Sequence, residues 1–268
     1  MMVRLETALR TRRDGGGKAF VPYVTGGFPG VDASLLRALQ DVGADALEVG
    51  VPFSDPVMDG GVIQEASRRS LEAGSTPALV LETIADASLS IPVAVMTYVN
   101  PVLRIGIGPF LDLAVSAGVA GVIVPDLPVD ECDQLSSEAG IREIDTVLLA
   151  APGTSATRIA SIAERSRGFI YCVATYGVTG TRDALSATAR TVVDALRPVT
   201  DLPLLVGVGI ASPQHAIEAC RFADGVIVGS ALMSPLVEGA RDDTVRLAAS
   251  FAEAVRRREP EGPDGRRT

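Results

Sequence analysis

Eight short apolar runs recur along this 268-residue chain, and longer amphipathic stretches separate them. Most of the runs are continuous rather than alternating, which is typical of strands buried on both faces of a parallel sheet. The predicted strands are Phe20–Val24, Ala46–Gly50, Val93–Tyr98, Gly121–Val124, Thr146–Ala150, Phe169–Ala174, Leu204–Val208 and Gly225–Val228. Helices are predicted at Ala33–Val42, Asp130–Ala139, Ala156–Arg165, from Pro213 toward Cys220, and at Ala240–Arg257.

Eight strand–helix units in a chain of this length predict a single (β/α)₈ TIM barrel. A short amphipathic helix within Met1–Arg13 precedes it. We expect the barrel domain to span 1–257 and the Arg-, Pro- and Gly-rich residues 258–268 to form a disordered tail. The alternative is a doubly wound open sheet, but its G-x-G-x-x-G fingerprint is absent after the first strand.

Charge and composition exclude several function classes. The chain carries 24 Lys and Arg against 33 Asp and Glu, a net charge of −9, which argues against binding to nucleic acid or to an anionic membrane surface. His215 is the one histidine, so a site with several histidine ligands is impossible and no metal is predicted. Three scattered cysteines indicate a reduced, cytoplasmic protein, and no apolar run reaches the roughly 18 residues that a membrane span needs.

Chemistry in a barrel lies at the carboxyl ends of the strands. Glu48 stands in the second apolar run, where burial would favour its neutral form and suit it to proton transfer. The alternative is a structural carboxylate that bonds to a neighbouring backbone group. Asp55 and Asp59 follow in a long loop; either alone is common in turns, but together they could converge on the space that Glu48 faces.

Glycines at the ends of three late strands predict a phosphate site. Gly180 follows the sixth strand, Gly209 the seventh, and Gly229 with Ser230 the eighth. Glycine lets backbone N–H groups approach an anion, and a helix N-terminus adds partial positive charge. Lys18 is the only lysine early in the chain, so a Schiff-base aldolase lacks its lysine, and a metal-dependent aldolase lacks its ligands.

At this point the sequence resembles a known family. The run Leu-Glu-Val-Gly-Val-Pro-Phe-Ser-Asp-Pro-Val-Met-Asp-Gly at 47–60 closely resembles the signature of the tryptophan synthase alpha subunit. Matching motifs lie at 22–25, 96–101, 124–128, 177–180, 207–210 and 229–231, so the resemblance covers nearly the whole chain. It implies a lyase that cleaves indole-3-glycerol phosphate to indole and glyceraldehyde 3-phosphate in tryptophan biosynthesis.

The resemblance also implies roles for single residues. Glu48 matches the general acid/base, and Asp59 matches the carboxylate that accepts from the indole N–H. Thr179 matches a loop residue that packs near Asp59 on closure. The phosphate would be held by Gly180, Gly209, Gly229 and Ser230, and the indole ring by Tyr23, Met96, Tyr98, Ile123 and Tyr171.

The family further implies a partner. Asp55, Asn100 and Pro101 match positions that meet a beta subunit, which carries pyridoxal phosphate in an alpha2beta2 tetramer, while this subunit uses no cofactor. Three functions stay open beside that of the alpha subunit: a stand-alone lyase that releases free indole, a non-catalytic barrel that docks a partner, and another isomerase or epimerase acting on sugar phosphates.

Four residues depart from the family pattern. Gly61 stands in place of a usual Pro, and Val208 in place of a common aromatic residue. Tyr176 is bulkier than expected, and Phe28 stands where many members have an acid. We expect Gly61 to loosen the acidic loop and Val208 to shrink one pocket wall. None of the four removes a proposed catalytic group.

Overall fold

The eight predicted strands form one closed, parallel barrel. The computed structural model describes residues 4–174 and 182–257, of which 182–186 are described by their backbone alone. Thr179, Gly180, Tyr176 and the predicted tail at 258–268 lie outside these residues. The strands are β1 (Ala19–Thr25), β2 (Leu47–Gly50), β3 (Val93–Met96), β4 (Val119–Ile123), β5 (Asp145–Ala150), β6 (Ile170–Val173), β7 (Leu204–Gly207) and β8 (Gly225–Val228).

Strand order closes the sheet and excludes the doubly wound alternative. Each strand pairs with the next, and β8 returns to β1 with Ala19 opposite Gly225. Every residue of β1, β2, β4, β6, β7 and β8 is buried, because the barrel interior covers one face and the helices cover the other. The continuous apolar runs therefore reflect burial on both faces.

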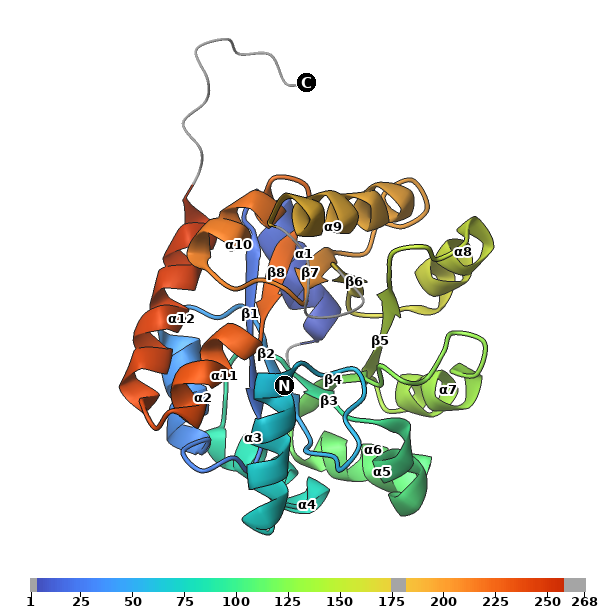
Figure 1. Cartoon of the computed structure of the whole chain (residues 1–268). Coiled ribbons are helices and arrows are strands. Elements are labelled where there is room, and N and C mark those ends of the chain that lie inside the picture. The colour runs from blue at the N-terminus through green and yellow to red at the C-terminus, as the bar shows by residue number, and fades with distance from the viewer. Residues whose placement is uncertain (1–3, 175–181, 258–268) are drawn as a thin grey trace.

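Helices surround the strands on all sides (Figure 1). They are α1 (Leu5–Asp14), α2 (Ala33–Asp41), α3 (Gly61–Glu72), α4 (Pro77–Ala87), α5 (Val99–Ile105), α6 (Ile107–Ser116), α7 (Asp133–Ile141), α8 (Ala156–Arg165), α9 (Arg182–Leu196), α10 (Pro213–Cys220), α11 (Ser230–Val237) and α12 (Arg241–Arg256). Side-chain caps begin several of them, such as Ser212, whose hydroxyl accepts from the His215 N–H at the start of α10.

Helix α1 covers the amino end of the barrel and leaves the carboxyl end for the site. Leu5 is fully buried, and a Cβ built on Gly121 of β4 would lie 2.6 Å from its Cδ2, so only glycine fits there. Asp145, the first residue of β5, accepts from the Glu6 N–H and the Arg4 guanidinium, both at 3.0 Å. These bonds hold the start of α1 against the strand ends.

Some predicted element bounds were wrong. The third strand ends at Met96 rather than Tyr98, because Tyr98 already precedes the first turn of α5. Helix α7 begins at Asp133 rather than Asp130, since turns closed by Leu127 N–H to Val124 O and by Glu131 N–H to Pro128 O occupy the preceding residues. The seventh strand ends at Gly207, because Val208 takes a positive φ of 64°.

Candidate active site

Glu48 lies in β2 with its carboxyl group buried inside the barrel. Its register partners are Tyr23 of β1 and Ala94 of β3, and 1% of the residue is exposed. Neither carboxyl oxygen has a hydrogen-bond partner among the described residues, so the structural alternative of a backbone-bonded carboxylate does not apply within them. Burial, with the nearby charge of Asp59, raises the pKa of Glu48 to about 8.

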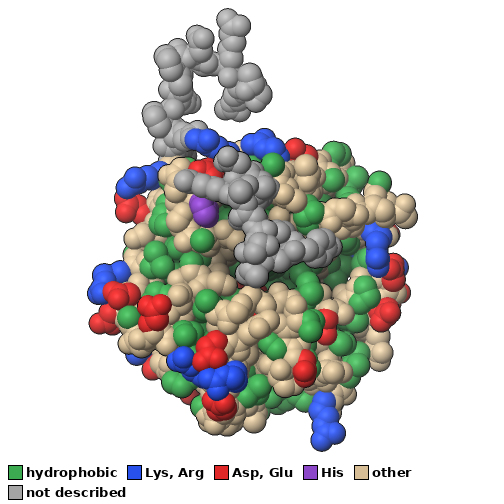
Figure 2. Space-filling model, in the orientation of Figure 1, with side chains coloured by type: hydrophobic (Ala, Val, Ile, Leu, Met, Phe, Trp, Pro, Cys, Tyr) green, Lys and Arg blue, Asp and Glu red, His purple; other side chains and the backbone are tan. Residues whose placement is uncertain are grey.

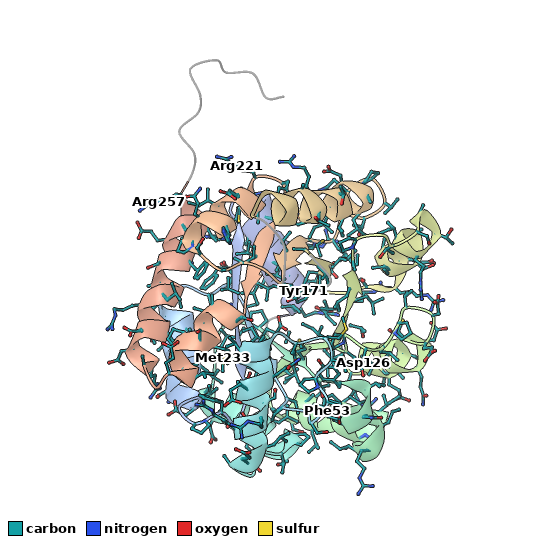
Figure 3. The ribbon with its side chains drawn as sticks, in the orientation of Figure 1. Phe53, Asp126, Tyr171, Arg221, Met233 and Arg257 are labelled. Carbon is teal, nitrogen blue, oxygen red and sulfur yellow. The ribbon has the colours of Figure 1, made fainter. Side chains whose placement is uncertain are left out.

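Tyr171 reaches the same interior from the far side of the barrel. It lies in β6, and Figure 3 places it near the centre of the ring of strands. Burial raises the pKa of Tyr171 well above its ordinary value, and the charges of Glu48 and Asp59 add to this. The two carboxyl groups and this ring therefore share one enclosed, weakly polar space.

Tyr23 has room beside Glu48 because two glycines flank its ring. A Cβ on Gly50 would lie 2.2 Å from the Tyr23 hydroxyl, and one on Gly229 would lie 3.4 Å from Tyr23 Cδ1. The ring thus lies between the end of β2 and the predicted phosphate turn after β8. Met96 and Ile123, which are paired between β3 and β4, stand at the same level of the barrel.

Asp59 is held at the edge of this space by its own loop and by Tyr98. The Tyr98 hydroxyl donates to Asp59 Oδ2 at 3.2 Å, and Gln64 Nε2 donates to the Asp59 carbonyl at 2.9 Å. Burial raises the pKa of Asp59 to about 6, and the Tyr98 hydrogen bond acts against this rise. At neutral pH the structure therefore holds a neutral Glu48 beside an ionised Asp59, two carboxyl groups in different protonation states.

The predicted phosphate residues lie at the carboxyl ends of β7 and β8. Gly229 precedes α11, and Ser230 is its exposed first residue. Gly209 follows Val208, and both take positive φ values, 93° and 64°. A left-handed β-branched residue is a rare, strained conformation, found mostly at functional sites. Val208 is 44% exposed, so it stands at the rim of the site.

Comparison with known proteins identifies the family. The family model described as tryptophan synthase alpha chain matches residues 9–259. The chain belongs to the tryptophan synthase alpha chain family. It is 41% identical over 260 residues to the alpha chain of Cyanothece sp., covering 95% of this chain and 97% of that one. To the alpha chain of Carboxydothermus hydrogenoformans it is 43% identical over 236 residues, covering 87% and 88%.

Solved structures of the family share the barrel. A structure of Mycobacterium tuberculosis tryptophan synthase aligns with a TM-score of 0.88 at 35% identity, covering 96% of this chain and 99% of that chain. The alpha subunit from Legionella pneumophila aligns with a TM-score of 0.85 at 32% identity, covering 95% and 99%. As a tryptophan synthase alpha chain, the protein is a lyase that cleaves indole-3-glycerol phosphate to indole and glyceraldehyde 3-phosphate in tryptophan biosynthesis.

The predicted partner residues of the alpha chain lie in two segments, the loop before α3 and the start of α5, and exposed apolar side chains adjoin both in sequence. Asp55 and Asn100 are exposed, and Pro101 is half-buried. Val57, Met58 and Leu103 beside them are 77%, 43% and 58% exposed. On the face seen in Figure 2, basic and acidic side chains lie beside one another around the rim.

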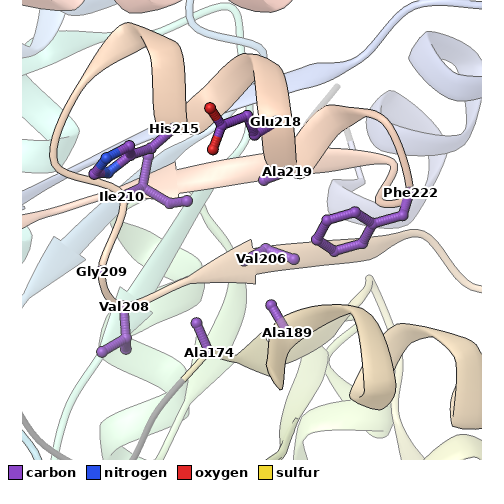
Figure 4. A pocket seen from close by; sticks show the side chains of 10 residues that line it. All are labelled: Ala174, Ala189, Val206, Val208, Gly209, Ile210, His215, Glu218, Ala219 and Phe222. Carbon is purple, nitrogen blue, oxygen red and sulfur yellow. The ribbon is translucent and has the colours of Figure 1, made fainter. Parts of the chain in front are cut away.

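A small apolar cavity lies behind the Gly209 turn, between β7, α9 and α10. Figure 4 shows its lining side chains, which include His215 and Glu218 of α10, Phe222 just after that helix, and Val206 of β7. His215 Nδ1 accepts from the Ala211 N–H at 3.3 Å. That bond occupies one ring nitrogen of His215, which is half-buried near the start of α10.

Two residues near the site received no role from the sequence. Phe53 stacks on Tyr98 with ring centroids 5.1 Å apart, and Asp126 accepts from the Val99 N–H at 2.9 Å. Asp126 follows β4, so the rule that chemistry lies at the carboxyl ends of strands could have found it. Within residues 4–174 and 182–257, no cluster of His, Cys, Asp and Glu could hold a metal ion, and no helix is long and apolar enough to cross a membrane.

Proposed function

We propose that Glu48 and Asp59 divide the chemistry of the cleavage between them. The observation that carries this proposal is the Glu48 carboxyl group, which is buried, raised in pKa and without a hydrogen-bond partner among the described residues. Leaving a buried polar group unpaired costs free energy, so such a group has to be explained by what binds beside it. The substrate would place two groups beside the Glu48 carboxyl group: a ring carbon that accepts a proton and a side-chain hydroxyl that gives one.

Glu48 acts first as an acid and then as a base. Its neutral carboxyl gives a proton to the indole carbon that bears the side chain. The resulting carboxylate then takes the proton of the adjacent side-chain hydroxyl. The bond between the hydroxyl-bearing side-chain carbon and the protonated ring carbon breaks, and its electron pair returns to the ring. The hydroxyl-bearing carbon becomes the aldehyde carbon of glyceraldehyde 3-phosphate. Glu48 ends protonated, as it began.

Asp59 stabilises the cationic intermediate between these steps. Protonation of the ring carbon places positive charge on the indole nitrogen, and an ionised carboxylate that accepts from its N–H lowers the energy of that state. A pKa of about 6 keeps Asp59 ionised at neutral pH. The apolar walls exclude water and so strengthen this interaction.

The remaining predicted residues bind the ends of the substrate. We assign the indole ring to the pocket of Tyr23, Met96, Tyr98, Ile123 and Tyr171, and the phosphate to Gly209, Gly229 and Ser230. Support comes from Gly229, where an added Cβ would meet Tyr23 at 3.4 Å, so the two ends of the pocket adjoin. Thr179 and Gly180 would complete the enclosure.

We also propose that the chain works with a beta subunit in an alpha2beta2 tetramer. Asp55, Asn100 and Pro101, with exposed Val57, Met58 and Leu103, form the docking surface. Pyridoxal phosphate belongs to that partner, which receives the indole, and this subunit binds no cofactor. The three described cysteines are free and buried, which supports a cytoplasmic location.

Indole formation by the purified chain tests the proposal. The protein is incubated with indole-3-glycerol phosphate, with and without a tryptophan synthase beta subunit, and indole is measured. We expect slow release by the chain alone and faster release with the partner. Fast turnover that ignores the partner would identify a stand-alone lyase. No indole under either condition would contradict the proposed function.

A further inference from the structure

We propose that Asp126 is a positioning residue for Asp59 and acts through the start of α5 and Tyr98. This inference rests on the proposed role of Asp59. It assigns a task to the Val-Pro-Asp-Leu-Pro run at 124–128, which neither the mechanism nor the predicted binding residues use. Three elements take part: the loop after β4, the first turn of α5, and the acidic loop between β2 and α3.

The first contact joins the loop after β4 to α5. Asp126 Oδ1 accepts from the Val99 N–H at 2.9 Å, and Val99 is the first residue of α5. The residue before the helix is Tyr98, whose side chain makes no cap bond to α5. Asp126 therefore supplies the acceptor for an N–H group in the first turn of α5, although it lies in a distant part of the chain. A turn closed by Leu127 N–H to Val124 O holds Asp126 itself.

The second set of contacts joins Tyr98 to the acidic loop. The Tyr98 hydroxyl accepts from the Met58 N–H at 3.0 Å and donates to Asp59 Oδ2 at 3.2 Å. Its ring stacks on Phe53 at the other end of the same loop, with centroids 5.1 Å apart and planes 27° apart. Tyr98 thus holds the loop at both ends. Figure 3 shows Phe53 and Asp126 on the same side of the barrel.

The sequence places Val99 next to Tyr98, so the Asp126 bond limits the movement of the Tyr98 backbone. If that bond is lost, the first turn of α5 can shift and the Tyr98 hydroxyl moves relative to Asp59. Hydrogen bonds to an ionised carboxylate lower its pKa, and a weaker bond lets the pKa rise. A change in the pKa of Asp59 should therefore reveal the loss of the Asp126 bond to Val99, although the two carboxyl groups do not bond to each other.

Other titratable groups face Asp59 from neighbouring elements. In the described part of the chain they are Glu48 of β2, Tyr23 of β1, Tyr171 of β6 and Tyr98 itself. Glu48 and the tyrosines are neutral when Asp59 titrates near pH 6, so a shift of its midpoint reflects changed hydrogen bonding or position rather than a new charge.

Carbon-13 NMR of protein labelled at the aspartate carboxyl carbons tests the proposal without substrate. The Asp59 signal is assigned by its loss in Asp59→Asn. We expect a midpoint near 6 in the wild type and an upward shift of about half a unit or more in Asp126→Ala and in Tyr98→Phe. Asp126→Asn keeps an oxygen that can accept from Val99, so its midpoint should stay close to the wild type.

Two comparisons separate the proposed path from a general disturbance. In Tyr98→Phe, adding Asp126→Ala should cause no further shift, because the hydroxyl through which Asp126 acts is already gone. Asp130→Ala removes an exposed carboxylate nearby that pairs with Arg158, and it should leave the midpoint unchanged.

An unchanged midpoint in Tyr98→Phe, additive shifts in the double variant, or an equal shift in Asp126→Asn and Asp126→Ala would each overturn the proposal. The Tyr98→Phe result decides the matter even if Asp126→Ala does not fold. Retained indole formation by Asp59→Asn would instead refute the role of Asp59 and leave the titration result standing.

Discussion

Glu48→Gln is expected to lower kcat for indole formation by about 10²–10⁴-fold, the range that general acid–base catalysis contributes. Glutamine keeps the size and the buried position of the side chain but can neither give the proton to the ring carbon nor take it from the hydroxyl. Steady-state kinetics with indole-3-glycerol phosphate measure the loss, and calorimetry with the same substrate should give an affinity close to that of the wild type.

Stability provides the control for Glu48→Gln. The folded pKa of about 8 lies above the ordinary value of 4.5, so the unfolded state releases this proton first. The wild-type free energy of unfolding therefore falls as pH rises from about 4.5 to about 8, on the order of several kcal/mol in total. The glutamine variant lacks this loss, so it should gain stability relative to the wild type across that window.

Glu82→Gln serves as a matched variant, since Glu82 is exposed on α4, and it should keep the wild-type rate. Near-normal turnover by Glu48→Gln would refute the acid/base assignment. A variant that is inactive because it is unfolded would show itself in the stability measurement.

Asp59→Asn is expected to lower kcat by about 10²–10³-fold, the cost of removing one preorganised electrostatic group. The amide can still accept from the indole N–H, but it lacks the charge that stabilises the cation, so some turnover should persist. The substitution should lower kcat more than it raises KM, because the positive charge on the indole develops only after the substrate has bound. Single-turnover kinetics separate the cleavage step from product release.

Asp86→Asn makes the same change at an exposed position on α4 and should leave the rate unaltered. If Asp59→Asn cleaves at the wild-type rate, the electrostatic role is wrong. A rise in KM of the same size with kcat unchanged would show instead that Asp59 contributes to ground-state binding.

The barrel could be predicted from the sequence because its cause is local. Each strand is buried on both faces, so each appears as a continuous apolar run, and counting the runs gives the architecture. The buried position of Glu48 could be predicted for the same reason, since its carboxyl group stands inside such an apolar run. The glycines at 209 and 229 also follow from local turn geometry.

What could not be predicted depends on contacts between distant segments. The sequence predicts a third strand that continues to Tyr98, whereas in the fold Tyr98 precedes a helix of seven residues, which is too short to show a clear helical period. The bond between Asp126 and Val99 joins the ends of two adjacent strands, and their register is unknown until the barrel closes. The stack of Phe53 on Tyr98 likewise needs the folded acidic loop.

The protonation state of Glu48 tests the central claim most directly. Infrared difference spectra of wild type minus Glu48→Gln, recorded across pH without substrate, isolate the C=O stretch of this one protonated carboxyl group. We predict that the band persists at pH 7 and disappears with a midpoint of about 8. A band already lost by about pH 5, the behaviour of a solvated glutamate, would contradict the account.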